Sequence, residues 1–208
     1  QESLYWSVCA RLRRKTPQSM IDLPVRYDGF DYGHDPLLKI TAVDPSFFYA
    51  LSPFSASRTV LKVERRDYAD ERARDSWLYR LDESVTRVIS VLRLKTGVGG
   101  ALFYEDAEED AHSNIGWEAN VSGEWPVNGR LSSYAVIGYR GVEYEDEVYP
   151  DLQLEDRSDT QLNFAAGASF RITTEFRLSA GWRYVDNNSS FELYEYDRNV
   201  VSMSGMVS

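Results

Sequence analysis

The sequence predicts an all-β fold, an antiparallel transmembrane β-barrel with about ten visible strands, short periplasmic turns and long acidic extracellular loops. Three observations carry this prediction. Apolar and polar residues alternate with a period of two in several windows, which is typical of strands with two different faces. No run approaches the roughly 20 consecutive apolar residues that a membrane helix needs. Short and long connections alternate along the chain, as they do in outer-membrane barrels.

The expected strands follow from the alternation, taken in order along the chain. The clearest windows are 114–125, 161–172 and 175–185, where apolar residues occupy one parity and small or polar residues the other. Each of them spans about the 9–11 residues that a tilted strand needs to cross the hydrocarbon layer. We expect ten strands, near 3–14, 37–51, 57–67, 76–89, 91–104, 113–125, 131–144, 159–172, 174–185 and 191–208.

The connections between these strands fall into two kinds. We expect short turns at 52–56, near Ser90, at 126–129 and at Thr173. The longer, mostly polar connections are expected at 15–36, 68–75, 105–112, 145–158 and 186–190. The segment 15–36, which includes Pro17, Pro24 and Gly29, is expected to be a long loop or a place where chain is missing. Residues 1–208 then form a single barrel domain, and an even number of strands places both termini at the short-turn end.

A soluble β-sandwich or lipocalin-like barrel is the alternative, because its strands also alternate. Such domains place large apolar residues inside, whereas here the face opposite the aromatic residues is small and polar. That face is typical of a lumen, since bulky side chains cannot all fit inside a ten-strand cylinder. The sequence therefore favours a membrane barrel. An aromatic girdle at the membrane interface is expected from Trp117, Trp125, Phe176, Trp182 and Tyr184.

Charge and composition restrict the partners. The net charge is −10, which argues against a nucleic-acid partner because the phosphate backbone is bound through positive charge. Cys9 is the only cysteine, so no internal disulfide is possible. We expect the chain in the bacterial outer membrane, in contact with its lipid, with lipopolysaccharide and with other envelope proteins. No sequence pattern indicates a cofactor or a metal site.

Charged residues of the lumen-facing parity form the main candidate site. We expect the lumen to be lined by Arg93, Lys95, Glu118, Glu124, Arg171, Glu175, Arg177, Arg183 and Arg198. In a narrow barrel such charges form salt bridges that stiffen the wall and close the pore, whereas in a wider one they select anions or guide an anionic polymer. The small expected strand number favours the closed, structural lumen.

Catalysis has only weak support in the sequence. The two histidines, His34 and His112, fall in expected loops near aspartates, which is the arrangement that a rim protease site needs. Acidic residues are abundant throughout, however, and no nucleophile elbow, phosphate loop or zinc spacing is present. The acidic clusters at 105–110 and 143–147 are expected to be solvated loop surfaces, although divalent cations are able to bridge such carboxylates. We therefore expect no enzymatic activity.

The C-terminal hairpin carries a resemblance to known families. Tyr184, Asn188 and Ser189 form a corner that precedes Tyr194, Tyr196 and Arg198 at the entry to the last strand, and Arg157-Ser158-Asp159 opens the preceding hairpin in the same style. This pattern resembles the last hairpin of Gram-negative outer-membrane β-barrel proteins, in particular porin-like families and barrels fused behind tetratricopeptide repeats. It covers about the last 55 residues well.

The resemblance implies a membrane-embedded component of an export or envelope-assembly complex. Two other roles stay open at this point. One is a small porin with an arginine-lined lumen, and the other is a surface adhesin that acts through its long loops, since loops frequently carry recognition.

Overall fold

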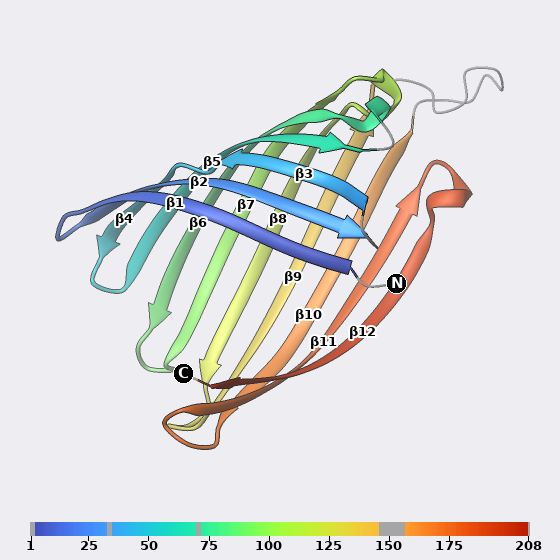
Figure 1. Ribbon diagram of the computed structural model, residues 1–208. Helices are drawn as coiled ribbons and strands as arrows, with labels where there is room; N and C mark the ends of the chain where they lie inside the picture. The colour runs from blue at the N-terminus through green and yellow to red at the C-terminus, as the bar shows by residue number, and fades with distance from the viewer. Residues whose placement is uncertain (1–2, 33–34, 70–71, 146–156, 208) are drawn as a thin grey trace.

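A computed structural model describes residues 3–32, 35–69, 72–145 and 157–207, and nearly all of them lie in one antiparallel sheet that curves around a hollow interior (Figure 1). Its strands are β1 (Ser3–Lys15), β2 (Ser19–Tyr32), β3 (Asp35–Val43), β4 (Ser46–Ser52), β5 (Ser55–Tyr68), β6 (Ser76–Ile89), β7 (Leu94–Ala107), β8 (Asn114–Pro126), β9 (Leu131–Tyr144), β10 (Ser158–Arg171), β11 (Phe176–Ser189) and β12 (Tyr196–Val207). Among the described residues, three single-turn 3₁₀ helices lie in the connections, at Arg72–Arg74, Asp110–His112 and Glu192–Tyr194.

The strands follow one another around the sheet in chain order, except that β3 and β4 share one position between β2 and β5. Asp44 and Pro45 separate the two. Proline has no N–H to donate, so it interrupts a ladder. The neighbouring strands still bond to the break, because the Asp44 amide donates to the Pro24 carbonyl and the Leu61 amide donates to the Pro45 carbonyl. The twelve strands therefore occupy eleven positions.

The fold confirms the all-β antiparallel barrel and corrects two details of the sequence prediction. The segment 15–36 is not a loop: most of it forms β2, which pairs with β1 over its whole length. Pro24 and Gly29 interrupt an otherwise regular alternation in β2, in which Ile21, Leu23 and Val25 lie on the outer face. The expected strand 37–51 is likewise divided into β3 and β4.

Adding β2 changes the direction of the first strand. The short connections, at residues 16–18, 53–54, 90–93, 127–130 and 172–175, lie at one end of the sheet, which we call the turn end. The opposite, loop end carries the connections at 33–34, 69–75, 108–113, 145–157 and 190–195. Strand β1 begins at the loop end and β12 finishes at the turn end. The expectation that both ends of the chain lie at the turn end is therefore wrong, because eleven positions are an odd number.

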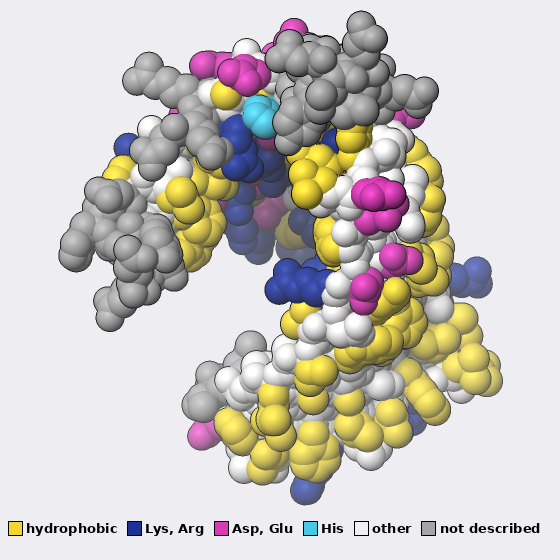
Figure 2. Space-filling view, turned by 90° about the vertical axis from the view of Figure 1, so that its right-hand side faces the viewer, with side chains coloured by type: hydrophobic (Ala, Val, Ile, Leu, Met, Phe, Trp, Pro, Cys, Tyr) yellow, Lys and Arg dark blue, Asp and Glu magenta, His cyan; other side chains and the backbone are white. Residues whose placement is uncertain are grey.

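The two faces of the wall differ in chemistry. Large apolar side chains cover the outside, where for example Val121 is 52% and Trp117 is 45% exposed, and Figure 2 shows apolar side chains over much of the outer wall with basic side chains in the hollow. Among the described residues, fewer apolar residues than polar ones are buried. The one apolar cluster among the described residues consists of Leu78, Phe103 and Val142. A soluble β-domain needs a dry apolar interior, so this distribution fits a wall that faces lipid.

Among the described residues, no helix combines the length and the hydrophobicity needed to cross a membrane.

Candidate functional site

Strand register places a continuous row of side chains around the inner face of the wall. We call it the central row. Its members, each directly opposite the next in the ladder, are Arg13, Asp22, Ser46, Val60, Asp82, Ala101, Glu118, Arg140, Gln161, Asn187 and Tyr196. The row divides the inner face into a loop-side lumen, between the row and the loop end, and a turn-side lumen, between the row and the turn end.

A buried carboxylate organises the loop-side lumen between β2 and β6. The Glu64 side chain is only 2% exposed, and it pairs with Lys62 at 2.6 Å and with Arg66 at 2.7 Å. Arg26 lies 3.5 Å from the same carboxylate and 2.9 Å from Asp28. Three cations around one carboxylate compensate the loss of its hydration, which otherwise makes a buried charge very costly.

This cluster extends to the neighbouring strands on both sides. Toward β1, the Ser7 hydroxyl donates to Asp28 at 2.5 Å. Toward β7, Arg66 donates to Glu105 at 2.8 Å, and the Ser76 hydroxyl donates to the same oxygen at 2.7 Å. Hydrogen-bonded charges therefore connect β1 with β7 through the interior of the wall.

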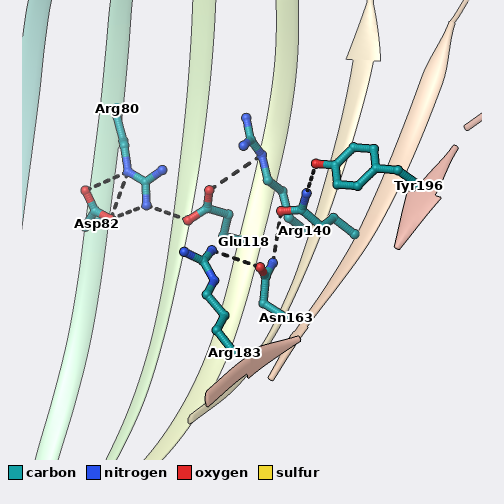
Figure 3. A network of polar contacts seen from close by, with 8 residues as sticks. Arg80, Asp82, Glu118, Arg140, Asn163, Arg183 and Tyr196 are labelled. Carbon is teal, nitrogen blue, oxygen red and sulfur yellow. Dashed lines mark hydrogen bonds and ion pairs between the residues drawn. The ribbon is translucent and has the colours of Figure 1, made fainter. Parts of the chain in front are cut away.

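A second network crosses from β6 to β9 at the level of the central row (Figure 3). Arg80 donates to Glu118 at 2.6 Å and to Asp82 at 2.8 Å, and Arg140 lies 3.6 Å from the other Glu118 oxygen. The Arg80 and Arg140 guanidinium groups also lie 5.8 Å and 4.7 Å from the centre of the Phe103 ring, within the range of a cation–π contact. This network joins an ion-paired triad to the small apolar cluster.

Phe103 occupies its position because residue 116 is a glycine. A Cβ atom at Gly116 would lie 2.2 Å from the tip of the Phe103 ring, closer than any real contact. The missing side chain thus lets the ring lie flat on β8, between the two arginines. Glycine in a strand commonly marks such a close approach.

The turn-side lumen is different, because small side chains line it and most of its cations lack ion pairs among the described residues. Arg183 donates one hydrogen bond, to the Asn163 amide oxygen at 3.1 Å, and Asn163 in turn donates to Gln161. A hollow of about 440 Å³ lies here, lined among others by Gly138, Ala165 and Arg183. Among the described residues, the turn-side cations without an ion pair are Lys15, Arg58, Arg171, Arg177, Arg183 and Arg198.

The carboxylates of the inner face are distributed in the opposite way. Eight inward carboxylates of the described strands each pair with an arginine or a lysine. These carboxylates are Asp22, Asp28, Glu64, Asp82, Glu105, Glu118, Glu124 and Asp159. Within the turn-side lumen of the described chain, the single ion pair is Lys95 with Glu124, which is loose at 3.8 Å and more than half exposed on both sides. The turn-side lumen therefore carries a surplus of positive charge.

The residues that the sequence predicts to line the lumen divide into three groups. Glu118 and Arg183 lie within the networks just described. Lys95, Glu124, Arg171, Arg177 and Arg198 have the inward parity and lie on the turn side or at its end. Arg93 and Glu175 do not line the wall, because β7 begins only at Leu94 and β11 only at Phe176, so both residues lie in short turns. Arg93 has a positive φ of 51°, which serves the tight turn after β6.

Several central residues escape the sequence analysis. Glu64, Arg80 and Arg140 take part in the ion pairs that join neighbouring strands, yet none of them is a candidate from the sequence. The signal for Glu64 and Arg80 is the run of charged residues at even positions of β5 and β6, which obscures the apolar alternation that identifies the other strands. Polar residues on the inward parity are themselves the signature of a lumen wall.

The expected girdle residues all have the outward parity. Trp117 packs against Tyr139 across β8 and β9, with ring centres 5.6 Å apart, and Trp182 lies 6.4 Å from Tyr184 on β11. Trp125 and Phe176 lie close to the turn end. Trp182 also donates its indole N–H to Asn199 of β12 at 3.1 Å.

A stacked arginine closes the hairpin corner at the loop end. The Arg157 guanidinium lies 3.5 Å from the Tyr194 ring centre and 4.3 Å from that of Tyr144, and it pairs with Asp159. Burial is the largest single influence and works against the charged form of Arg157, but the hydrogen bond and charge of Asp159, together with Tyr144 and Tyr194, outweigh it and raise the pKa of Arg157. These contacts join β9, β10 and the connection between β11 and β12 beside a hollow of about 270 Å³.

The histidines show no catalytic arrangement in the described residues. His112 is exposed in the 3₁₀ turn after β7, and its amide donates to the Glu109 carbonyl. His34 lies outside the described residues. No group of three or more histidine, cysteine or acidic side chains within the described part of the chain is placed to hold a metal ion.

Solved structures with a similar fold include outer membrane proteins. OmpT, an outer membrane protein of Vibrio cholerae, matches 99% of this chain and 89% of its own, with a TM-score of 0.52 and 11% identity. Its loop L8 deletion mutant matches 98% and 89%, with a TM-score of 0.56 and 11% identity. LpxR from Salmonella typhimurium matches 97% and 88%, with a TM-score of 0.46 and 11% identity. No family model matches the chain, and no curated protein matches it.

The chain is thus an outer-membrane β-barrel, and its lipid-facing apolar wall locates it in the bacterial outer membrane. One expectation needs correction. The sequence predicts no enzymatic activity, but the barrel fold that the chain shares with these outer membrane proteins is compatible with an enzyme. The barrel fold therefore gives no ground for that exclusion. The finer resemblance to porin-like and tetratricopeptide-linked families stays a prediction.

Proposed function

We propose that the barrel provides a path for anionic solutes, which enter its positively charged turn-side lumen from the periplasm. The observation that carries this proposal is the uneven pairing of charges. Eight inward carboxylates of the described strands are each paired with a cation, whereas six turn-side cations lack an ion pair among the described residues. A ring of unneutralised cations in a low-dielectric wall raises the local concentration of anions.

The shape of the turn-side lumen supports the same role. Between the central row and the turn end, the inward positions of β6 to β10 are mostly small, as at Ser84, Gly99, Gly138 and Ala165. Small side chains leave room for a hydrated ion. Above them, the Arg80–Glu118–Arg140 triad and Phe103 reach inward and narrow the path. The triad is the expected constriction, and the basic region below it is the anion-attracting vestibule.

The test is ion selectivity in a planar bilayer. With a KCl gradient across the bilayer, the unmodified chain should show a reversal potential of the sign that chloride preference produces. The double variant Arg183→Gln with Arg198→Gln should move this potential toward zero. Arg87→Gln is the matched control, because Arg87 lies in the same half of the wall with the outward parity. Cation preference in the unmodified chain, or an equal shift in the control, would contradict the proposal.

A role in export or envelope assembly remains the expectation that the C-terminal hairpin implies.

A further inference from the structure

A chain of side-chain hydrogen bonds crosses the inner wall from β11 through β10 to β12 (Figure 3). Arg183 donates to the Asn163 amide oxygen at 3.1 Å, and the Asn163 amide nitrogen donates to the Gln161 amide oxygen at 3.0 Å. The Gln161 amide nitrogen then donates to the Tyr196 hydroxyl oxygen at 3.0 Å. We call these four side chains the amide relay. It begins at a turn-side cation and ends at a tyrosine of the central row.

The charge of Arg183 fixes the direction of the amide relay. A guanidinium group only donates hydrogen bonds, so Asn163 turns its oxygen toward Arg183 and its nitrogen toward Gln161. The same constraint turns the Gln161 nitrogen toward Tyr196, whose oxygen accepts. The Tyr196 O–H is left to donate to another group, and it has no acceptor among the described residues. Hydrogen bonds in a chain polarise one another, so the cation at the start strengthens the donor at the end.

Tyr196 lines the hollow of about 270 Å³ at the loop-side face of the central row, and Arg140 lines the same hollow. Arg140 directs its Nε toward Glu118 at 3.6 Å, and its side chain is 41% exposed. Its terminal nitrogens make no hydrogen bond within the described part of the chain. Arg157, also in the hollow, is already paired with Asp159. The Tyr196 hydroxyl and the Arg140 guanidinium are thus unused donors in one hollow, where they suit an anionic acceptor.

Charge and lining narrow the class of that acceptor. The amide relay and the triad, taken with Asp82, contain three arginines and two carboxylates, so one positive charge remains. An apolar surface lies beside the donors, because Val142 and Leu193 also line the hollow. An anion with a single charge and a small apolar part matches both features. A carboxylate fits in addition because its two oxygens match the planar guanidinium group.

We propose that this hollow binds the carboxylate group of a small organic acid. Arg140 and Tyr196 donate to it directly, and Arg183 is a positioning residue that acts through the amide relay. The role of the site rests on the proposed anion path, to which it adds a class of solute and a binding step on the loop side of the constriction.

Binding of benzoate to the full chain in lipid nanodiscs tests this proposal. Isothermal titration without a salt gradient should show saturable binding, and benzyl alcohol, which has the same ring without the charge, should not compete. Tyr196→Phe removes only the hydroxyl group and should weaken binding by at least about tenfold, as the loss of a hydrogen bond to a charged group does. Tyr184→Phe is the matched control, because Tyr184 lies on β11 with the outward parity.

A double-mutant cycle tests the amide relay itself. Arg183→Gln should weaken benzoate binding in the unmodified chain, because the direction of the relay is then no longer fixed. In the Tyr196→Phe background the same change should lose most of its effect, since the relay ends at a ring without a hydroxyl group. A charge that acts directly through space lowers the affinity equally in both backgrounds.

Four results would overturn the proposal. They are the absence of saturable benzoate binding, an equal loss in Tyr184→Phe, competition by benzyl alcohol, and tighter binding of inorganic phosphate than of benzoate. An undiminished effect of Arg183→Gln in the Tyr196→Phe background would remove the role of the amide relay. The reversal potential in a KCl gradient reports on the anion path separately. Chloride preference without benzoate binding therefore removes the site alone, whereas cation preference removes the path.

Discussion

The loop-side and turn-side halves of the lumen are built from the same residue types but use them differently. On the loop side, arginines surround carboxylates such as Glu64, so the charges are satisfied within the wall. On the turn side, arginines such as Arg183 extend from strands whose neighbours are small or neutral. The comparison teaches that arginine in a barrel lumen has no fixed role. The residue opposite or diagonal to the arginine in the ladder decides whether that arginine forms an ion pair within the wall or faces the solute.

The largest expected effect is the loss of the buried carboxylate on the loop side. Glu64→Gln leaves Arg26, Lys62 and Arg66 around a neutral side chain, and removing one partner from a buried ion pair typically costs about 3–5 kcal/mol. Urea unfolding followed by tryptophan fluorescence measures the change. Arg58→Gln, on the turn side of the same strand, should leave stability unchanged. Equal losses in both variants would remove the distinction between the two halves.

The second effect separates the two faces of the wall within the turn-side half. Ala180 faces outward and Ala165 inward, and they lie on adjacent paired strands. Ala180→Arg should cost about 2–4 kcal/mol, the range for a charge placed in mid-bilayer on the lipid face. Ala165→Arg should cost much less, because it adds a charge beside water. Folding yield and urea midpoint in lipid vesicles are the measurements, and a larger loss for Ala165→Arg would contradict the assignment of the faces.

A third variant compares packing in the two halves. Gly116→Ala places a Cβ 2.2 Å from the Phe103 ring, whereas the nearest atom to a Cβ at Gly138 is 3.6 Å away. Gly116→Ala should therefore cost about 1–3 kcal/mol, as overpacking typically does. Gly138→Ala should be close to neutral. The same unfolding assay distinguishes the two, and equal behaviour would mean that the loop-side lumen is no more tightly packed than the turn side.

The smallest effect is expected for the turn-side ion pair. Lys95 and Glu124 are more than half exposed and 3.8 Å apart, so solvent screens their attraction. Lys95→Gln should change the free energy of unfolding by about 0.5 kcal/mol or less. Repeating the measurement at low and high salt checks the reason, because the unmodified pair should lose its small contribution as salt rises.

Local alternation accounts for most of what the sequence predicted correctly. The expected strands 76–89 and 131–144 coincide with β6 and β9, and the expected girdle residues have the outward parity. Strand β2 is not evident from the sequence because Pro24 and Gly29 are typical of loops. Pro24 is tolerated inside the strand because it lies opposite Asp44, in the break between β3 and β4, so its missing N–H faces the point where the ladder is already interrupted.

The candidate site was harder to predict than the strands. Parity indicated the inward direction of Glu118 and Arg183, but it did not show that one is ion-paired and the other is not. Pairing depends on register, and register joins residues far apart in the chain, such as Arg80 with Glu118 and Arg66 with Glu105. Arg93 and Glu175 were misplaced for a local reason, since strand ends determine whether a charge lies in the wall or in a turn.

The sequence by itself determined the type of wall, because the period-two pattern specifies which residues face lipid and which face the lumen, whatever strands lie beside them. Only the tertiary structure decided which charges meet, how the twelve strands fill eleven positions, and that β1 and β12 run in the same direction. The physical reason is that a side chain's face is a property of its own strand. Its partners, and the closure of the sheet, are properties of the order and register in which all the strands associate.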